Sequence, residues 1–135
     1  MIELSNTNAQ TLAAGQSAVF DIIILHTGCA ECYRPTTGAI NLTQKNAIYE
    51  VGFNCNIGAT AGGEGQIAIT LDGAPLLETT ALTTVAAADD LVNVSGETFI
   101  QTCCCGNPGT ILLTNTGTTE ITLGAHPRIS VKRKA

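Results

Sequence analysis

The chain has 135 residues, a length at which one hydrophobic core is normal, so we expect a single domain over residues 1–135. Hydrophobic residues make up 44% of the chain and charged residues 13%, and there is no Trp. Such a chain can bury a core but has few charges with which to solvate the surface of an isolated monomer. We therefore expect copies of the chain to cover part of one another.

Charge is distributed unevenly along the chain. Residues 1–127 hold all 11 acidic residues and only two basic ones, Arg34 and Lys45, so this part carries a charge of −9. An acidic body repels phosphate groups, which argues against a nucleic-acid partner. The remaining basic residues gather near the end of the chain, where we expect them to attach the protein to a scaffold: Arg128, Lys132, Arg133 and Lys134.

The sequence predicts neither a membrane segment nor a leader. No run reaches the roughly 18 apolar residues that span a bilayer, so we expect no membrane partner. The first ten residues, MIELSNTNAQ, lack the basic and apolar regions of a signal peptide, so we expect synthesis in the cytoplasm.

Apolar and polar residues alternate in short β-branched runs that Gly, Pro and Asn separate, and helical spacing of apolar residues is not sustained. This pattern predicts an all-β fold, a single jelly-roll-like sandwich of about eight antiparallel strands. The predicted strands cover residues 18–27, 39–43, 48–57, 66–71, 90–102, 110–114, 119–123 and 128–132.

The clearest predicted strand is 48–57, which we expect at the centre of a sheet. One of its faces is apolar and should point into the core: Tyr49, Val51, Phe53, Cys55 and Ile57.

Two turn signals connect predicted strands. Asp72-Gly73 predicts a tight turn after strand 66–71. The run 114–118, TNTGT, predicts a second hairpin between two β-rich runs.

Two long connections and the two ends of the chain carry further expectations. We expect residues 28–38 and 79–89 to be long loops, and the second, being small and apolar, to pack against another subunit. Residues 1–10 and 132–135 should be an N-terminal arm and a basic C-terminal tail that tether the protein.

The cysteines form the one constellation with ligand-like spacing. His26-x2-Cys29-x2-Cys32 lies far in sequence from Cys103-Cys104-Cys105, but loops at one end of an antiparallel sandwich converge, so we expect the two groups to approach each other. We favour disulfide bonds, which would act as staples, among Cys29, Cys32, Cys103, Cys104 and Cys105. The second interpretation is that these thiols stay free. A zinc site is the third, and its ligands would be His26, Cys29, Cys32, Cys103 and Cys105.

No set of residues predicts catalysis, so we expect the protein not to be an enzyme and to hold no cofactor. Cys29 has a nearby histidine but no Gly-rich turn that would stabilise an oxyanion. Asp89-Asp90 fits a solvated turn at the start of a strand better than a calcium site.

Five stretches together carry a resemblance over nearly the whole chain. They are HTGCAECYR, AIYEVGFNCNIG, IAITLDGAPLLETT, DLVNVSGETFI and ILLTNTGTTEITLGAHPRISVKR. They resemble the small jelly-roll structural proteins of tailed phages and prophages of Gram-positive gut bacteria. More distantly they are similar to trimeric heads of the tumour-necrosis-factor type, including the tips of collagen-like spore-surface proteins.

The resemblance implies a homotrimer in the virion that decorates or stabilises a phage capsid, with the major capsid protein or another particle scaffold as its partner. The alternative is a receptor-binding or adhesion head of a phage fibre or a spore-surface-like appendage. The chain has no Gly-X-Y stalk and only two tyrosines, which weighs against a fibre tip that binds sugars.

Overall fold

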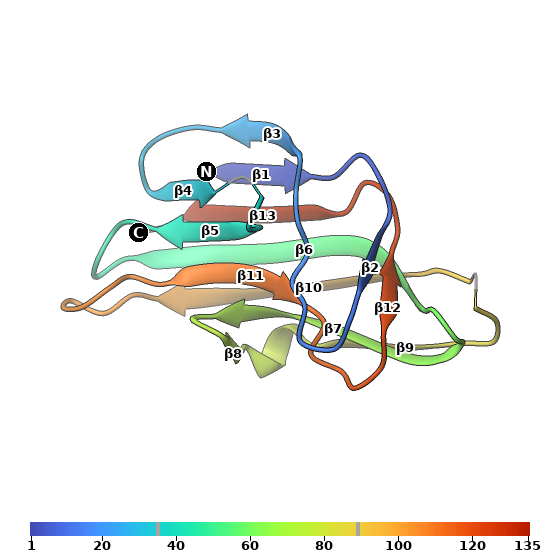
Figure 1. The fold of residues 1–135 in the computed structure, drawn as a ribbon. Helices are drawn as coiled ribbons and strands as arrows, with labels where there is room; N and C mark the ends of the chain where they lie inside the picture. The colour runs from blue at the N-terminus through green and yellow to red at the C-terminus, as the bar shows by residue number, and fades with distance from the viewer. Residues whose placement is uncertain (35, 89) are drawn as a thin grey trace.

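The computed structural model describes residues 1–34, 36–88 and 90–135. Its elements are all strands apart from one short 3-10 turn, η1 (Leu77–Thr79) (Figure 1). In chain order the strands are β1 (Ile2–Ser5), β2 (Gln10–Leu12), β3 (Ile22–His26), β4 (Glu31–Arg34), β5 (Ala39–Leu42), β6 (Ile48–Ala59), β7 (Gly63–Leu71), β8 (Ala74–Pro75), β9 (Ala81–Val85), β10 (Val92–Gln101), β11 (Thr110–Thr114), β12 (Ile121–Leu123) and β13 (Arg128–Arg133).

The strands form two antiparallel sheets that pack face to face, which confirms the predicted all-β jelly-roll sandwich. The first sheet has the order β2-β12-β6-β13-β1-β3, and β10 pairs with β6 on the side away from β13. The second sheet has the order β4-β5-β11-β7-β8, and β9 pairs with β7. The eight predicted strands are all present, with shifted ends, and the further strands β1, β2, β4, β8 and β9 are short.

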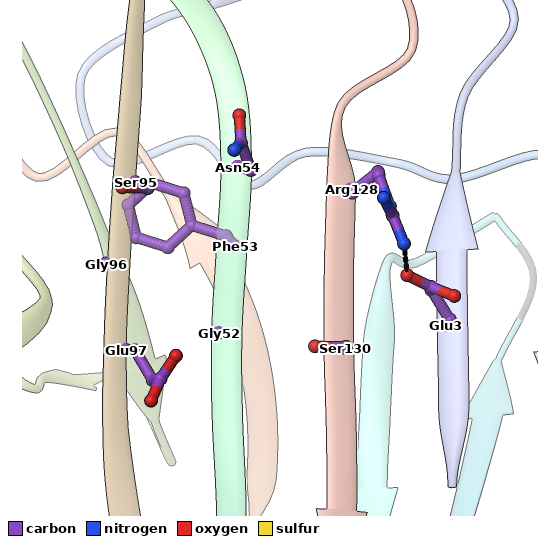
Figure 2. Close-up of a pocket in the computed structure, with 9 residues that line it drawn as sticks. All are labelled: Glu3, Gly52, Phe53, Asn54, Ser95, Gly96, Glu97, Arg128 and Ser130. Atoms are coloured by element: carbon purple, nitrogen blue, oxygen red, sulfur yellow. Dashed lines mark hydrogen bonds and ion pairs between the residues drawn. The ribbon is translucent and has the colours of Figure 1, made fainter.

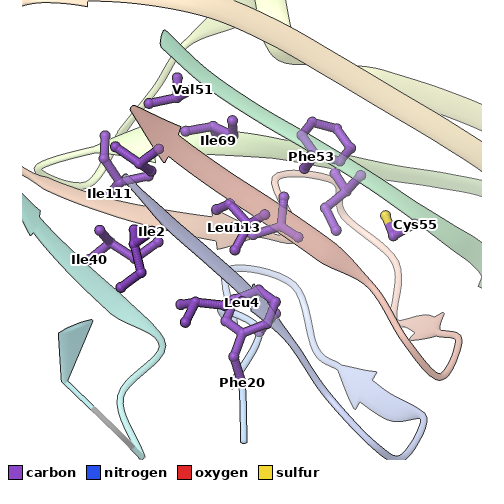
Figure 3. Close-up of a cluster of buried hydrophobic side chains, with 14 of the residues drawn as sticks. Ile2, Leu4, Phe20, Ile40, Val51, Phe53, Cys55, Ile69, Ile111 and Leu113 are labelled. Carbon is purple, nitrogen blue, oxygen red and sulfur yellow. The ribbon is translucent and has the colours of Figure 1, made fainter. Parts of the chain in front are cut away.

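The core lies between the sheets, and β6 supplies its central row. Tyr49, Val51, Phe53, Cys55 and Ile57 are all buried, as the alternation predicts. Figure 3 shows Phe53 and Cys55 in one buried cluster with Leu113 of β11 and with Leu4 of β1, which lies next to Phe20. The Tyr49 hydroxyl donates to the Ala30 carbonyl at 2.7 Å, so the ring also pins the start of β4.

The Asp72-Gly73 turn forms as predicted. Both residues have positive φ, 52° and 86°, which suits the two central positions of a tight turn between β7 and β8.

The predicted hairpin at 114–118 is wrong, because β11 belongs to the second sheet and β12 to the first. The connection is a corner built on Asn115, whose side chain is fully buried. Its amide donates to the carbonyls of Leu12 and Thr119 at 3.0 and 2.8 Å, and its oxygen accepts from Gly117 N–H at 3.0 Å. A buried amide with its bonds made can close a sandwich corner where a hairpin would keep the chain in one sheet.

Three predicted irregular segments prove to be partly strand. Residues 1–10 are not a free arm, because they contain β1, which pairs with β13 on one side and with β3 on the other. The side chains of Ile2 and Leu4 are fully buried. Segment 28–38 contains β4, and segment 79–89 contains β9. Residues 35 and 89 of these segments lie outside the described residues.

The basic tail 132–135 also follows a neighbouring strand rather than hanging free. Arg133 ends β13, and beyond it Lys134 N–H donates to the Ile48 carbonyl at 2.7 Å. Ile48 N–H in turn donates to the Ala135 carbonyl at 3.0 Å. The tail therefore extends the pairing between β13 and β6.

Candidate functional site

Several exposed apolar side chains lie on the side of the sandwich where β9 and β10 are the edge strands of the two sheets. Thr98 Oγ1 donates to Glu78 at 3.0 Å, which holds η1 against β10. We name this surface the β9–β10 edge. It carries Leu77, Leu82, Val92 and Phe99, with exposed fractions of 76, 57, 40 and 60%. Within the predicted loop 79–89, it is strand β9 that contributes Leu82 to this surface.

A second apolar surface lies at the opposite edge of the first sheet. There β3 pairs with β1 on one side only, among the described residues. Its run Ile23, Ile24 and Leu25 is 51, 50 and 38% exposed. We name these three residues the β3 edge. Exposed apolar edge strands invite pairing or packing with another chain.

Between the two edges, the outward face of the first sheet is polar and forms a groove of about 320 Å³ (Figure 2). Its floor is low because Gly52 and the small Ser130 are paired side by side on β6 and β13. Arg128 forms an ion pair with Glu3 on one wall, and Glu97 stands on the other. The groove lacks the apolar lining that a typical small-molecule site has.

The predicted attachment residues differ in their surroundings. Arg128 is bound to Glu3, and Lys134 Nζ lies 3.4 Å from Glu50, so both already have acidic partners. Lys132 and Arg133 are exposed and make no ion pair within the described part of the chain.

The two cysteine segments lie against the same turn. Thr43 N–H donates to the Ala30 carbonyl at 3.0 Å and its hydroxyl donates to Cys29, while Asn46 N–H donates to the Cys103 carbonyl at 3.1 Å. The segments therefore flank the 43–46 turn, at the sandwich end where Figure 1 places both termini. All six cysteines are free, and the staples among Cys29, Cys32, Cys103, Cys104 and Cys105 stay a prediction.

The described residues assemble no metal site. Within them no three His, Cys, Asp or Glu side chains are grouped to hold an ion, so the alternative of His26, Cys29, Cys32, Cys103 and Cys105 is not gathered here. His26 Nε2 instead lies 3.0 Å from the Glu31 carbonyl oxygen. Of the Asp89-Asp90 pair, Asp89 falls outside the described residues and Asp90 is exposed.

Cys55 and Glu31 are the buried titratable groups of note. Burial raises the pKa of the Cys55 thiol to about 12, so it stays protonated and unreactive at neutral pH. The Glu31 side chain is fully buried, and its carboxylate lies 3.0 Å from the Met1 amino group. Sequence reasoning missed Glu31, because nothing in the run CAECYR distinguishes a buried carboxylate from a solvated one.

No helix in the described ranges is long and apolar enough to cross a bilayer.

The fold and surfaces define a class: a two-sheet jelly-roll sandwich with exposed apolar edge strands and, among the described residues, no group of side chains that could hold a metal ion. No family model and no curated protein matches the sequence.

Solved structures do match the fold. The Eiger TNF of S. frugiperda superposes with a TM-score of 0.67 at 8% identity, covering 99% of this chain and 91% of that one. The globular domain of zebrafish complement 1qA gives 0.61 at 7% identity, with 97% and 94% covered. PRD1 vertex protein P5 gives 0.52 at 11% identity, with 95% and 93% covered. At these identities the likeness establishes the fold.

Proposed function

We propose that this protein is a structural virion protein: a homotrimeric jelly-roll head that coats or stabilises a phage capsid and catalyses no reaction. The observation that carries the proposal is the pair of different apolar surfaces, the β9–β10 edge and the β3 edge, on opposite sides of the sandwich. Each leaves several large side chains in water on an isolated copy, which favours burial against another chain.

Two unlike surfaces on opposite edges suit a heterologous contact, in which the β9–β10 edge of one copy meets the β3 edge of the next. Repeating that contact by rotation closes a ring. An isologous dimer would bury only one of the two surfaces and leave the other exposed. The resemblance to trimeric heads of the tumour-necrosis-factor type supports three as the number of copies.

The polar groove between the edges fits the same arrangement. The outward face of the first sheet, with its charged side chains, lies between the edge strands β10 and β3. Glu97, on the edge strand β10, borders the contact that we propose. An apolar contact with charged residues around it is the usual anatomy of a stable interface.

The proposed location is the capsid surface, after synthesis in the host cytoplasm. Support comes from the resemblance to phage jelly-roll proteins and from a vertex protein, PRD1 P5, among the structural neighbours. The partner would be the major capsid protein or another particle scaffold, reached through the exposed Lys132 and Arg133.

Charge substitutions at the two edges test the ring. We expect light scattering of the reduced wild type to give a trimer, and Phe99→Asp and Ile24→Asp each to give monomers. Both side chains are at least half exposed, so the monomers should keep the folded circular-dichroism spectrum. The control is Thr122→Asp, which adds a carboxylate at a half-buried site outside both edges and so tests whether an added charge alone disrupts folding.

Mixing the two variants tests the heterologous geometry. An Ile24→Asp copy keeps an intact β9–β10 edge and a Phe99→Asp copy keeps an intact β3 edge, so together they should form a dimer with one good interface. A monomeric wild type would overturn the proposed function. A trimeric wild type whose variants also remain trimers would overturn the assignment of these edges.

A further inference from the structure

We infer that the 102–109 connection between β10 and β11 is a covalent docking point, at which Cys103, Cys104 and Cys105 form disulfide bonds to a second copy of this chain. All three thiols are exposed and free. The inference concerns bonds between copies, and it does not depend on the number of copies in the proposed ring.

Bonding within one copy is disfavoured by the surroundings of these thiols. The 43–46 turn hydrogen-bonds to Cys103 on one side and to Cys29 on the other, so it stands between the two cysteine segments. Neighbouring cysteines of the triplet also make poor partners for one another, because a disulfide needs Cα atoms about 4.4–6.8 Å apart with converging Cβ bonds. A disulfide bond at this loop would therefore need a thiol of another chain.

The loop is also built to reach outward. Figure 1 shows it projecting beyond the strands at the end of the sandwich that holds the termini. Within it, Cys103 accepts a hydrogen bond from Asn46, whereas Cys32 belongs to β4 and is held by its pairing with Asn41. Successive side chains of a non-helical segment point to different sides. A partner that approaches this end from either side therefore meets a thiol.

The chemistry is thiol–disulfide exchange with a small-molecule disulfide as the oxidant. A Cys104 thiolate attacks one sulfur of the oxidant, forming a mixed disulfide and releasing one small thiolate. A thiolate of the second copy then attacks the protein sulfur of that mixed disulfide and releases the second small thiolate. Two protein thiols are thereby oxidised by two electrons, and one small disulfide is reduced to two thiols.

The experiment oxidises the full chain with glutathione disulfide, blocks remaining thiols with N-ethylmaleimide, and separates the products on a non-reducing denaturing gel with peptide mapping. We expect cross-linked dimers and larger species that reductant returns to monomer. Combining Cys103→Ser, Cys104→Ser and Cys105→Ser should reduce the cross-linked fraction at least tenfold.

The matched control is Cys29→Ser with Cys32→Ser, which removes two other exposed thiols. This variant should keep most of the cross-linked fraction. Losses in the two variants that merely follow the number of thiols removed, three against two, would show random collision and overturn the inference. A bond mapped between the two segments in a band of monomer mobility would overturn it as well, as would glutathione adducts without any cross-link. Light scattering of reduced protein reports on the ring separately.

Discussion

Cys55 and Cys104 are the same residue type in opposite environments. Cys55 lies on the inward face of the long strand β6 and is 3% exposed, while Cys104 stands on an exposed loop at the end of the sandwich. Strand alternation determines the first environment completely, and the thiol there serves as a small apolar side chain. The loop leaves its thiols available, so their chemistry depends on what docks there. The buried core therefore determines the fold, whereas the exposed loop at the end of the sandwich is available for assembly contacts.

The largest expected effect on stability comes from a substitution in the core at Phe53, which lies next to Cys55 on the same face of β6. Replacing this nearly buried ring in Phe53→Ala removes apolar contacts and leaves a cavity, which should destabilise the protein by about 3–5 kcal/mol. Urea unfolding monitored by circular dichroism measures this loss. A cost below about 1 kcal/mol would mean that the site collapses around the smaller side chain.

Overfilling the same site should cost less. A Cβ added at Gly96 would lie 2.6 Å from the Thr79 carbonyl oxygen and 2.7 Å from Phe53 Cε1. Since both neighbours are buried, Gly96→Ala should destabilise by about 1–3 kcal/mol. The matched control is Gly73→Ala at an open turn position, where nothing lies within 4 Å of the added Cβ and only the positive φ opposes it. Equal losses in the two variants would contradict the packing explanation.

The Cys55 thiol should make stability fall at alkaline pH. Its folded pKa is raised to about 12 from an ordinary value of 9.0, so the folded state holds a proton that the unfolded state releases. This contribution is complete below pH 9 and is lost as pH rises toward 12, by about 1 kcal/mol per pH unit. Comparing wild type with Cys55→Ala by urea unfolding between pH 8 and pH 10.5 isolates it, because other groups titrate in both. The alkaline decline should be shallower in Cys55→Ala, and parallel declines would contradict the prediction.

Much of this fold follows from the sequence where burial has a period of two. Strand β6 alternates strictly, and so its existence, central position and inward face were all predictable. Strand β9, ALTTV, is rich in small and hydroxyl side chains, and pairing with β7 makes it a strand although its own pattern resembles a loop. Strand β1 was hidden for a similar reason, because a run of four residues is too short to show a period.

The candidate surfaces were less predictable than the core. The run of three isoleucines and a leucine in β3 has the composition of a strand buried on both faces, yet its place at the sheet edge exposes it. Which strand becomes an edge depends on the pairing of the whole chain. The side of the sandwich that carries Leu77, Leu82 and Phe99 likewise joins segments that only the topology brings together.

The smallest expected effect on stability concerns the basic tail, where the side chains of Lys132 and Arg133 are exposed to solvent. Truncating the tail would also remove the backbone bonds between Lys134, Ala135 and Ile48, so side-chain replacements test the attachment more cleanly. Lys132→Ser with Arg133→Ser should change stability by less than about 0.5 kcal/mol, as is usual for exposed positions.

The same double replacement should nevertheless weaken attachment to the capsid scaffold, because contacts between exposed charges and an acidic surface act within a Debye length of about 10 Å at 0.1 M salt. Co-sedimentation with native particles at low and high salt measures this, and the difference between wild type and variant should shrink as salt rises. Lys134→Ser is the matched control, since Lys134 is already engaged with Glu50 at 3.4 Å and should contribute less. If the double variant sediments with the particles as fully as wild type at low salt, the side chains of Lys132 and Arg133 play no part in attachment.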